Sequence, residues 1–254
     1  VGCYCEGTDP RRLGAVLKEN AGSKPLIMWK VGQTHAGMRA ASSHTGSITG
    51  SSDLWKSLFR QHGVIEVSNI EEMLDTTMIF SFLEPKGQGR VVIMSGPGGP
   101  AVSAADAVIA NGLRMAALES STESRLRTLL PSTGTSIRNP VDVGLGAAFD
   151  LNLYFDAIDC IAGDPQVDCI IIVGGGATDD LNEQYVNGLI ERQGAGGKHL
   201  IAIDFPGFIG NKQVLDPLYE NRVPVYPTPE RAIRSYARLM AFQRFREARP
   251  RPKP

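Results

Sequence analysis

Among the side chains that could take part in catalysis, His44 has the most suggestive setting, within the segment 41–47 (ASSHTGS). This segment is expected to be a loop between a strand at 25–31 and a helix at 52–62. A neutral imidazole is a good nucleophile near pH 7, since its ordinary pKa is about 6.5, and it can accept a phosphoryl group and return it. An exposed histidine without a chemical role is the alternative. The other histidines of the chain lack such small, mobile neighbours: His35, His62 and His199.

Glu6 is the natural partner of His44. It directly follows an expected strand at 2–5 and precedes Gly7. In doubly wound sheets the carboxyl ends of the strands form the binding crevice, and the His44 loop follows the strand at 25–31 on the same edge. A carboxylate that accepts one ring N–H fixes the tautomer and leaves the other nitrogen free to attack. The alternative is an exposed glutamate at a strand end.

A turn rich in glycine and proline, residues 96–100 (GPGGP), lies between an expected strand and an expected helix. Its backbone amides and the helix N-terminus would face an incoming anion. The turn is not a P-loop, because it lacks the Lys-Ser/Thr ending, and it lacks the GxGxxG spacing. A plain tight turn is the alternative. The candidate phosphate-binding residues are Gly98, Gly99, Pro100, Thr45 and Gly46.

Other features near these strand ends are open to two interpretations. The segment 139–142 (NPVD) either faces the crevice or only makes a turn, and 174–176 (GGG) is expected to be structural. A group of basic residues in the first half could attract phosphate or form a solvated face. These residues are Arg11, Arg12, Lys30 and Arg39.

The composition is that of a globular protein, with 42% hydrophobic and 21% charged residues among 254. A net charge of -1 argues against a broad nucleic-acid or membrane surface. No apolar run approaches the roughly 18 residues that a membrane span needs. The four cysteines are expected to be reduced packing residues, as in a cytoplasmic protein, and no metal site is expected.

Strands alternate with helices along the chain, a pattern typical of parallel sheets covered on both faces. The polar segment 84–89 (EPKGQG) interrupts this alternation and indicates a domain boundary. We therefore predict an α/β fold with one domain over 1–85, which carries the His44 loop, and a second over 89–246. Residues 247–254 are expected to form a disordered tail.

The two halves of the chain repeat one pattern, so the second half is predicted to be another copy of a flavodoxin-like unit. The matched elements, second copy first, are 169–174 with 2–5, 183–193 with 11–20, 199–204 with 25–31, 223–226 with 64–67 and 229–242 with 70–83. Residues 90–168 have no counterpart before Val1. The first domain is therefore predicted to be incomplete at its N-terminus, with the missing strands in a preceding segment or another chain, because a bare edge would be exposed. In place of His44 the second copy reads FPGFIG at 205–210.

Several stretches of the chain resemble the NDP-forming acyl-CoA synthetases, which include ADP-forming acetyl-CoA synthetase and are relatives of succinyl-CoA synthetase. The stretches are 4–7 (YCEG), 24–32, 41–47, 93–100 and 138–142 (RNPVD). The resemblance runs in the same order from Val1 to about Phe245. It implies two flavodoxin-like parallel-sheet domains, as in succinyl-CoA synthetase.

The resemblance also implies a chemistry. An acid, CoA and ATP become acyl-CoA, ADP and phosphate in a reversible cycle through an acyl phosphate. CoA displaces the phosphate, and a mobile histidine carries it to or from the nucleotide. His44 occupies the phosphohistidine position, and Glu6 matches the carboxylate that hydrogen-bonds it. The helix after 96–100 matches one of two helices whose N-termini face the phosphohistidine.

Two domains of this family, the CoA-binding and ATP-grasp domains, have no counterpart in the sequence. The resemblance therefore implies a fragment or subunit of a ligase. Coenzyme A and Mg-ATP or Mg-ADP are expected to bind mostly to partner domains or subunits, in an oligomer that acts on a carboxylic acid. Nucleic acids and membranes are not expected partners. A second hypothesis is a non-catalytic sensing module of a multidomain protein such as an acetyltransferase, and a third is a scaffolding subunit.

Overall fold

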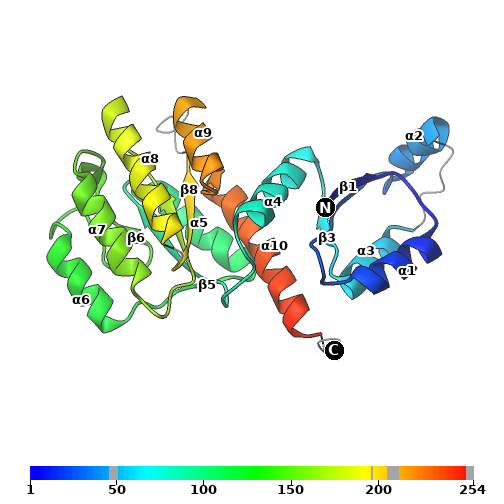
Figure 1. The fold of residues 1–254 in the computed structure, drawn as a ribbon, viewed down its shortest axis with the longest axis horizontal. Helices are drawn as coiled ribbons and strands as arrows, with labels where there is room; N and C mark the ends of the chain where they lie inside the picture. The colour runs from blue at the N-terminus through cyan, green and yellow to red at the C-terminus, as the bar shows by residue number, and fades with distance from the viewer. Residues whose placement is uncertain (46–50, 196, 205–211, 250–254) are drawn as a thin grey trace. The chain divides into compact units, whose positions relative to one another are not determined.

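The computed structural model describes residues 1–45, 51–195, 197–204 and 212–249 (Figure 1). Within these ranges, the side chains of Pro10, His44, Thr45 and Gln213 are not described. The chain divides into two compact units, and each is treated by itself. Unit 1 comprises Val1–Phe80 and Arg238–Pro254, and unit 2 comprises Ser81–Ala237.

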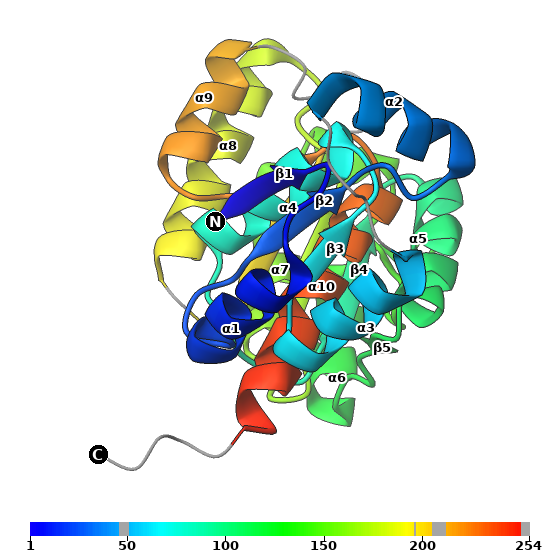
Figure 2. The same cartoon turned by 90° about the vertical axis from the view of Figure 1, so that its right-hand side faces the viewer.

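Unit 1 is built on a three-stranded parallel sheet with the order β1-β2-β3. Its strands are β1 (Gly2–Cys5), β2 (Ile27–Lys30) and β3 (Ile65–Val67). Its helices are α1 (Pro10–Asn20), α2 (His35–Thr45), α3 (Ser52–His62), most of α4 (Ile70–Phe82) and the last part of α10 (Pro229–Glu247). Figure 2 shows the three strands side by side with α1 and α3 in front of them.

Successive residues of a strand point to opposite sides of the sheet, and helices cover both faces of the unit 1 sheet. On one face Met28 packs with Trp55 and Phe59 of α3. On the other face Ile27 packs with Phe242 of α10. The register pairs Cys5 with Lys30, so the carboxyl ends of β1 and β2 meet at one edge.

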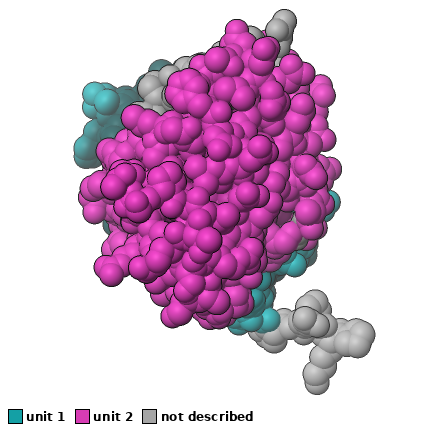
Figure 3. Space-filling view, turned by 90° about the vertical axis from the view of Figure 1, so that its left-hand side faces the viewer, with its two compact units in different colours: residues 1–80, 238–254 teal, residues 81–237 magenta. Residues whose placement is uncertain are grey.

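Unit 2 is built on a parallel sheet with the order β5-β4-β7-β8-β9, and β6 also pairs with β4. This is the flavodoxin-like order, with its switch point between β4 and β7. Figure 3 shows unit 2 as one continuous packed surface. The strands are β4 (Arg90–Ser95), β5 (Arg114–Met115), β6 (Val141–Asp142), β7 (Cys169–Val173), β8 (His199–Ile203) and β9 (Val225–Tyr226). The helices are α5 (Gly98–Ala110), α6 (Ser120–Leu129), η1 (Leu145–Ala148), α7 (Leu151–Ala162), α8 (Asp179–Gly194), α9 (Lys212–Glu220) and the first part of α10.

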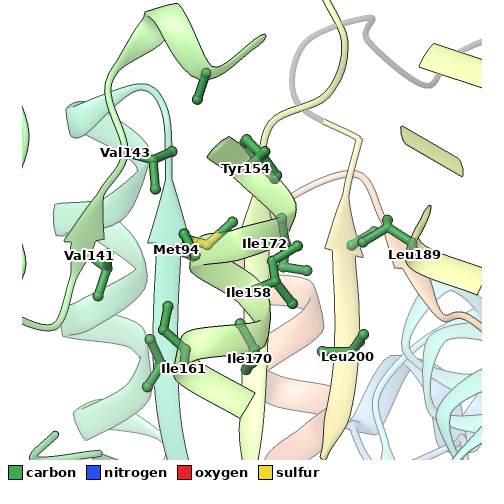
Figure 4. Packing of buried hydrophobic residues seen from close by; sticks show 14 of the residues in the cluster. Met94, Val141, Val143, Tyr154, Ile158, Ile161, Ile170, Ile172, Leu189 and Leu200 are labelled. Carbon is green, nitrogen blue, oxygen red and sulfur yellow. The ribbon is translucent and has the colours of Figure 1, made fainter. Parts of the chain in front are cut away.

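The core of unit 2 lies between the central strands and the helices on each face. In Figure 4, Ile170 and Ile172 of β7 face Ile158 and Ile161 of α7. The intervening Ile171 is equally buried, which shows that the opposite face is covered as well. Strands buried on both faces are nearly continuous apolar runs, as in CIIIV of β7.

The predicted repeat and the α/β fold class are confirmed. Strands β1, β2 and β3 of unit 1 follow the same order and direction as β7, β8 and β9 of unit 2. In each unit the last of these strands leads into a long helix, α4 or α10. The predicted segment 205–210 and the end of the predicted tail, 250–254, lie outside the described residues.

The described part of the segment that carries His44, residues 41–45, is helical, which corrects the prediction of a loop there. Helix α2 spans His35–Thr45 and places the His44 backbone in its last turn. The helix begins after Thr34, whose side chain accepts a hydrogen bond from the Gly37 amide at 3.1 Å, as N-cap residues do. Alanine, methionine and arginine predominate at 36–41 and favour a helix. The serines, threonine and glycine that follow had suggested a loop instead.

Candidate functional site

Glu6 lies at the carboxyl edge of the unit 1 sheet, directly after β1, where the sequence placed it. Its carboxylate accepts a hydrogen bond from the Tyr4 hydroxyl, with 3.1 Å between Oη and Oε1. Its main-chain carbonyl accepts a hydrogen bond from Lys30 Nζ at 2.7 Å. Glu6 is therefore held through its side chain by one residue and through its backbone by another.

Lys30, the last residue of β2, is only 3% exposed. Its ammonium donates hydrogen bonds to the carbonyl oxygens of Glu6 and Val31. Nζ also lies 5.2 Å from the centre of the Trp55 ring, within cation–π range. Burial lowers the pKa of Lys30, while the neighbouring Cys5 and Glu6 oppose that shift. The charge is thus kept at the strand edge by carbonyls and an aromatic face.

The candidate nucleophile His44 follows β2 along the chain, at the end of α2. Its imidazole and the Thr45 side chain lie outside the described side chains, and Gly46 lies outside the described residues. The hydrogen bond between Glu6 and His44 therefore stays a prediction. The phosphate-binding roles of Thr45 and Gly46 stay predictions as well.

A cavity of about 430 Å³ opens at the carboxyl edge of β2 and β3. Its wall is organised by Gln33, whose amide donates to the Lys30 carbonyl at 2.8 Å and accepts from the Ser52 hydroxyl at 2.9 Å. Two lysines, one buried and one exposed, contribute to the lining. The lining residues are Trp29, Lys30, Val31, Gly32, Gln33, Thr34, Lys56, Glu66, Val67 and Ser68.

The corresponding edge of unit 2 presents the N-terminus of α5. The helix begins at Gly98, and its N-cap position is Pro97, which has no side-chain group to satisfy the first amides. Gly98 and Gly99 are exposed, and a Cβ on Gly99 would meet no described heavy atom within 4 Å. These two amides can face an anion. Pro100 has no N–H, so it presents no donor and only favours the helical backbone.

Within the segment 139–142, two polar residues have different tasks. The Asn139 side chain donates to the carbonyls of Val91 and Ala116 at 2.8 and 3.0 Å, so it joins β4 to the end of β5. Asp142 accepts from the Gly144 amide at 2.8 Å through Oδ1. Its Oδ2 lies 3.7 Å from the place that a Cβ on Gly98 would take. Only Asp142 therefore lies beside the start of α5.

The glycines after β7 are structural, as the sequence indicated. At Gly174, where φ is +150°, a Cβ would lie 2.6 Å from the Tyr154 hydroxyl. At Gly176 it would lie 2.4 Å from the backbone of Leu181 in α8. The Gly176 amide donates to Asn182 Oδ1 at 3.0 Å. Close packing explains this glycine run without a ligand.

Two contributors to the unit 1 edge, Tyr4 and Lys30, were not identified as partners of Glu6 from the sequence. The available signal was the alternation of β2, which places Lys30 on the face that carries Met28. The remaining basic residues proposed around this crevice differ from Lys30, because they are exposed. They are Arg11, Arg12 and Arg39.

Among the described residues, no group of three or more His, Cys, Asp or Glu side chains is placed to hold a metal ion. In the same part of the chain, no helix is long and apolar enough to cross a membrane. All four cysteines are free, and two of them, Cys160 and Cys169, are buried.

Two family models match the chain in succession. The succinyl-CoA ligase-like flavodoxin domain matches residues 1–80, and the Ligase-CoA domain matches residues 91–241. The alpha subunit of acetate–CoA ligase [ADP-forming] II from Pyrococcus furiosus is 34% identical over 238 residues, which cover 91% of this chain and 50% of that protein. The 4-hydroxybutyrate–CoA ligase [ADP-forming] of Nitrosopumilus maritimus is 30% identical, covering 89% of this chain and 32% of that protein.

A solved structure agrees with these matches over nearly the whole chain. It is the dinucleotide-forming acetyl-coenzyme A synthetase 1 of Ca. Korarchaeum cryptofilum, in complex with phosphate and ADP. The TM-score is 0.81 at 27% identity, and the match covers 97% of this chain and 53% of that one. The chain thus spans about half the length of the alpha subunit and of the solved structure.

Proposed function

Because this chain belongs to the NDP-forming acyl-CoA synthetase family, we propose that it is the phosphate-carrying part of a cytoplasmic acyl-CoA ligase. The complete enzyme would convert a carboxylic acid, CoA and ATP into acyl-CoA, ADP and phosphate, reversibly. The observation that carries this proposal is the pair of hydrogen bonds that Glu6 accepts, from Tyr4 at its carboxylate and from Lys30 at its main-chain carbonyl. Lys30 ends β2, and the chain continues from there to His44.

In this proposal His44 is the nucleophile. One ring nitrogen attacks the γ-phosphorus of ATP, a nitrogen–phosphorus bond forms, the bond to ADP breaks, and ADP leaves. The substrate carboxylate then attacks that phosphorus and frees the imidazole, which gives an acyl phosphate. The CoA sulfur attacks the acyl carbon, and phosphate leaves. Glu6 accepts a hydrogen bond from the other ring N–H and orients the imidazole throughout.

The N-terminus of α5 is the proposed anion site, with the amides of Gly98 and Gly99 as donors. It would stabilise the phosphoryl group through the helix dipole, an effect of about 0.3–1 kcal/mol at an exposed site and up to about 2 kcal/mol when partly buried. Coenzyme A and Mg-ATP or Mg-ADP are assigned mainly to partner domains or subunits, an ATP-grasp partner among them, in an oligomer. The domain bounds 1–85 and 89–246 form part of the same proposal.

Labelling tests the role of His44. The full-length protein, together with its nucleotide-binding partner, is incubated with γ-labelled ATP, and acid-labile, base-stable label is located by mass spectrometry. The label should lie on His44, and His44→Ala should abolish both the label and ligase turnover. His35→Ala, at the other end of α2, is the matched control and should retain both. Turnover that survives in His44→Ala contradicts the proposal.

A further inference from the structure

Lys30 raises a question that packing alone does not answer. Lysine is almost never fully buried without a partner, because desolvating its charge is costly. Here the side chain is 3% exposed, and its ammonium contacts two backbone carbonyls and an aromatic ring. Burial disfavours the charged form, as the lowered pKa of Lys30 reflects.

The equivalent place in unit 2 is filled by isoleucine. Cys5 and Lys30 are the last register pair between β1 and β2, and Val173 and Ile203 are the last pair between β7 and β8. Ile203 is 0% exposed. The same fold position therefore accepts an apolar side chain in a buried setting, so the fold itself does not require an ammonium there.

The contact that distinguishes Lys30 is its hydrogen bond to the Glu6 carbonyl. It joins the residue that follows β1 to the last residue of β2 across 2.7 Å. Tyr4 donates a hydrogen bond to the carboxylate of the same glutamate. Lys30 adds a second restraint, on the backbone from which that carboxylate extends. An orienting carboxylate is effective only when its position is fixed, since displacement of about 1 Å can cost up to about 100-fold in rate.

We propose that Lys30 is a positioning residue for phosphoryl transfer, which acts through Glu6 by anchoring its backbone at the strand edge. The inference rests on the proposed function, because it assumes that Glu6 orients a phosphorylated histidine. It assigns a task to a buried charge that is otherwise unfavourable. Lys30 need not touch the acid, CoA or the nucleotide to have this effect.

The test is a double-mutant cycle in the full-length protein with its nucleotide-binding partner. Lys30→Met keeps the length and the apolar stem of the side chain but removes the donors. We expect kcat and the rate of histidine labelling to fall about 10-fold, with KM for acid and CoA within about 2-fold. In the Glu6→Gln background the same change should lower kcat by less than about 2-fold, because Lys30 is proposed to act only through Glu6.

Two further variants complete the test. Lys18→Met removes an exposed lysine of α1, outside the lining of the cavity, and should leave kcat unchanged. Lys30→Arg keeps a donor and a charge and should restore part of the lost rate. Should Lys30→Met fail to fold, the cycle is run with Lys30→Ile, which also removes the donors.

The outcomes separate this inference from the proposed function. Full kcat in a folded Lys30→Met protein, or an equal loss in the wild-type and Glu6→Gln backgrounds, overturns the positioning role. Neither result conflicts with a label on His44 in the unsubstituted protein, so the proposed function would stand. No label in the unsubstituted protein overturns the proposed function, and this inference with it.

Discussion

The carboxyl edges of the two sheets use one fold in different ways. In unit 1, Glu6 follows β1 and Lys30 ends β2, and the Lys30 ammonium donates a hydrogen bond to the Glu6 main-chain carbonyl. In unit 2, the equivalent positions after β7 and at the end of β8 are Gly174 and Ile203. Unit 2 presents backbone amides at the start of α5 instead. If the proposed function is correct, the unit 1 edge supplies reactive side chains and the unit 2 edge supplies the dipole of a helix N-terminus.

Steric crowding explains why the second edge carries no counterpart of Glu6. The hydroxyl of Tyr154 occupies the space beside Gly174 that any side chain would need. Gly174 also has a φ of +150°, a conformation that L side chains rarely adopt. A carboxylate cannot be added there without rebuilding the contact between α7 and β7. The two copies therefore differ in what their local packing permits as well as in sequence.

Exchanging the buried residues at the ends of β2 and β8 tests most directly whether the two strand ends differ in what they tolerate. Ile203→Lys should lower the free energy of unfolding by about 4 kcal/mol, because it leaves a charge in a site built for an apolar side chain. Lys30→Ile should keep stability within about 1 kcal/mol of the unsubstituted chain, since apolar replacements of buried charges are often tolerated. Urea unfolding near pH 7 measures both values.

The size of the two effects decides what the lysine is for. Equal destabilisation by Lys30→Ile and Ile203→Lys would make Lys30 a stabilising residue and remove the reason to assign it another task. A stable Lys30→Ile protein that has lost turnover would separate stability from function at this position. The end of β2 would then carry a charge that serves function, whereas the end of β8 is a buried apolar position.

A second difference between the units should appear as acid sensitivity. His199 begins β8 and is buried, whereas Leu26 takes the equivalent place in unit 1. Burial lowers the pKa of His199 to about 4, with help from Lys86, while Asp168 and the Glu84 backbone oppose the shift. Its Nδ1 lies 3.3 Å from the Tyr236 hydroxyl. The folded state thus keeps this imidazole neutral.

The sign of the pH effect follows from the two protonation states. Below the ordinary pKa of about 6.5, the unfolded chain binds a proton that the folded chain refuses, so stability falls with pH down to about 4. The loss of unfolding free energy that His199 causes should reach about 3 kcal/mol and then level off. In His199→Leu, unfolding free energies at about pH 7 and about pH 4.5 should differ by clearly less. An undiminished difference would assign the acid sensitivity to other groups. The Arg90–Asp168 pair contributes little to this difference. The stability that it adds is lost mainly as pH falls from about 3.8, the ordinary pKa of the carboxyl, to about 2, which is below the pH range compared.

The edges of the sheets were predictable from sequence because parallel strands are apolar runs that end abruptly. Once β1 and β2 were located, Glu6 had to follow one strand end and lie beside the next. The repeat was predictable for the same reason, since the strand order depends on these runs. The glycines after β7 were correctly interpreted as structural.

Contacts between distant residues were beyond the sequence. Whether Lys30 is exposed depends on the Trp55 ring, which comes from a helix more than twenty residues later. Asn139 joins β4 to β5 through its side chain, and nothing in the segment 139–142 distinguishes that task from a turn. Helix α2 was missed because its last residues favour loops when considered alone.

At the unit 2 edge, we expect a change at Asp142 to have only a modest effect. Its carboxylate lies beside the start of α5, where the proposed function places a phosphate, and like charges repel. Asp142→Asn should therefore lower the KM for phosphate about 3-fold when acyl-CoA, ADP and phosphate are converted to acid, CoA and ATP, with kcat unchanged. Asp156→Asn, which changes an exposed carboxylate of α7, is the control and should have no effect. A higher KM would mean that Asp142 meets the phosphate through a shared proton or a bridging cation. The unit 2 edge would then contribute a side chain to binding, and the contrast with unit 1 would narrow to the absence of a nucleophile.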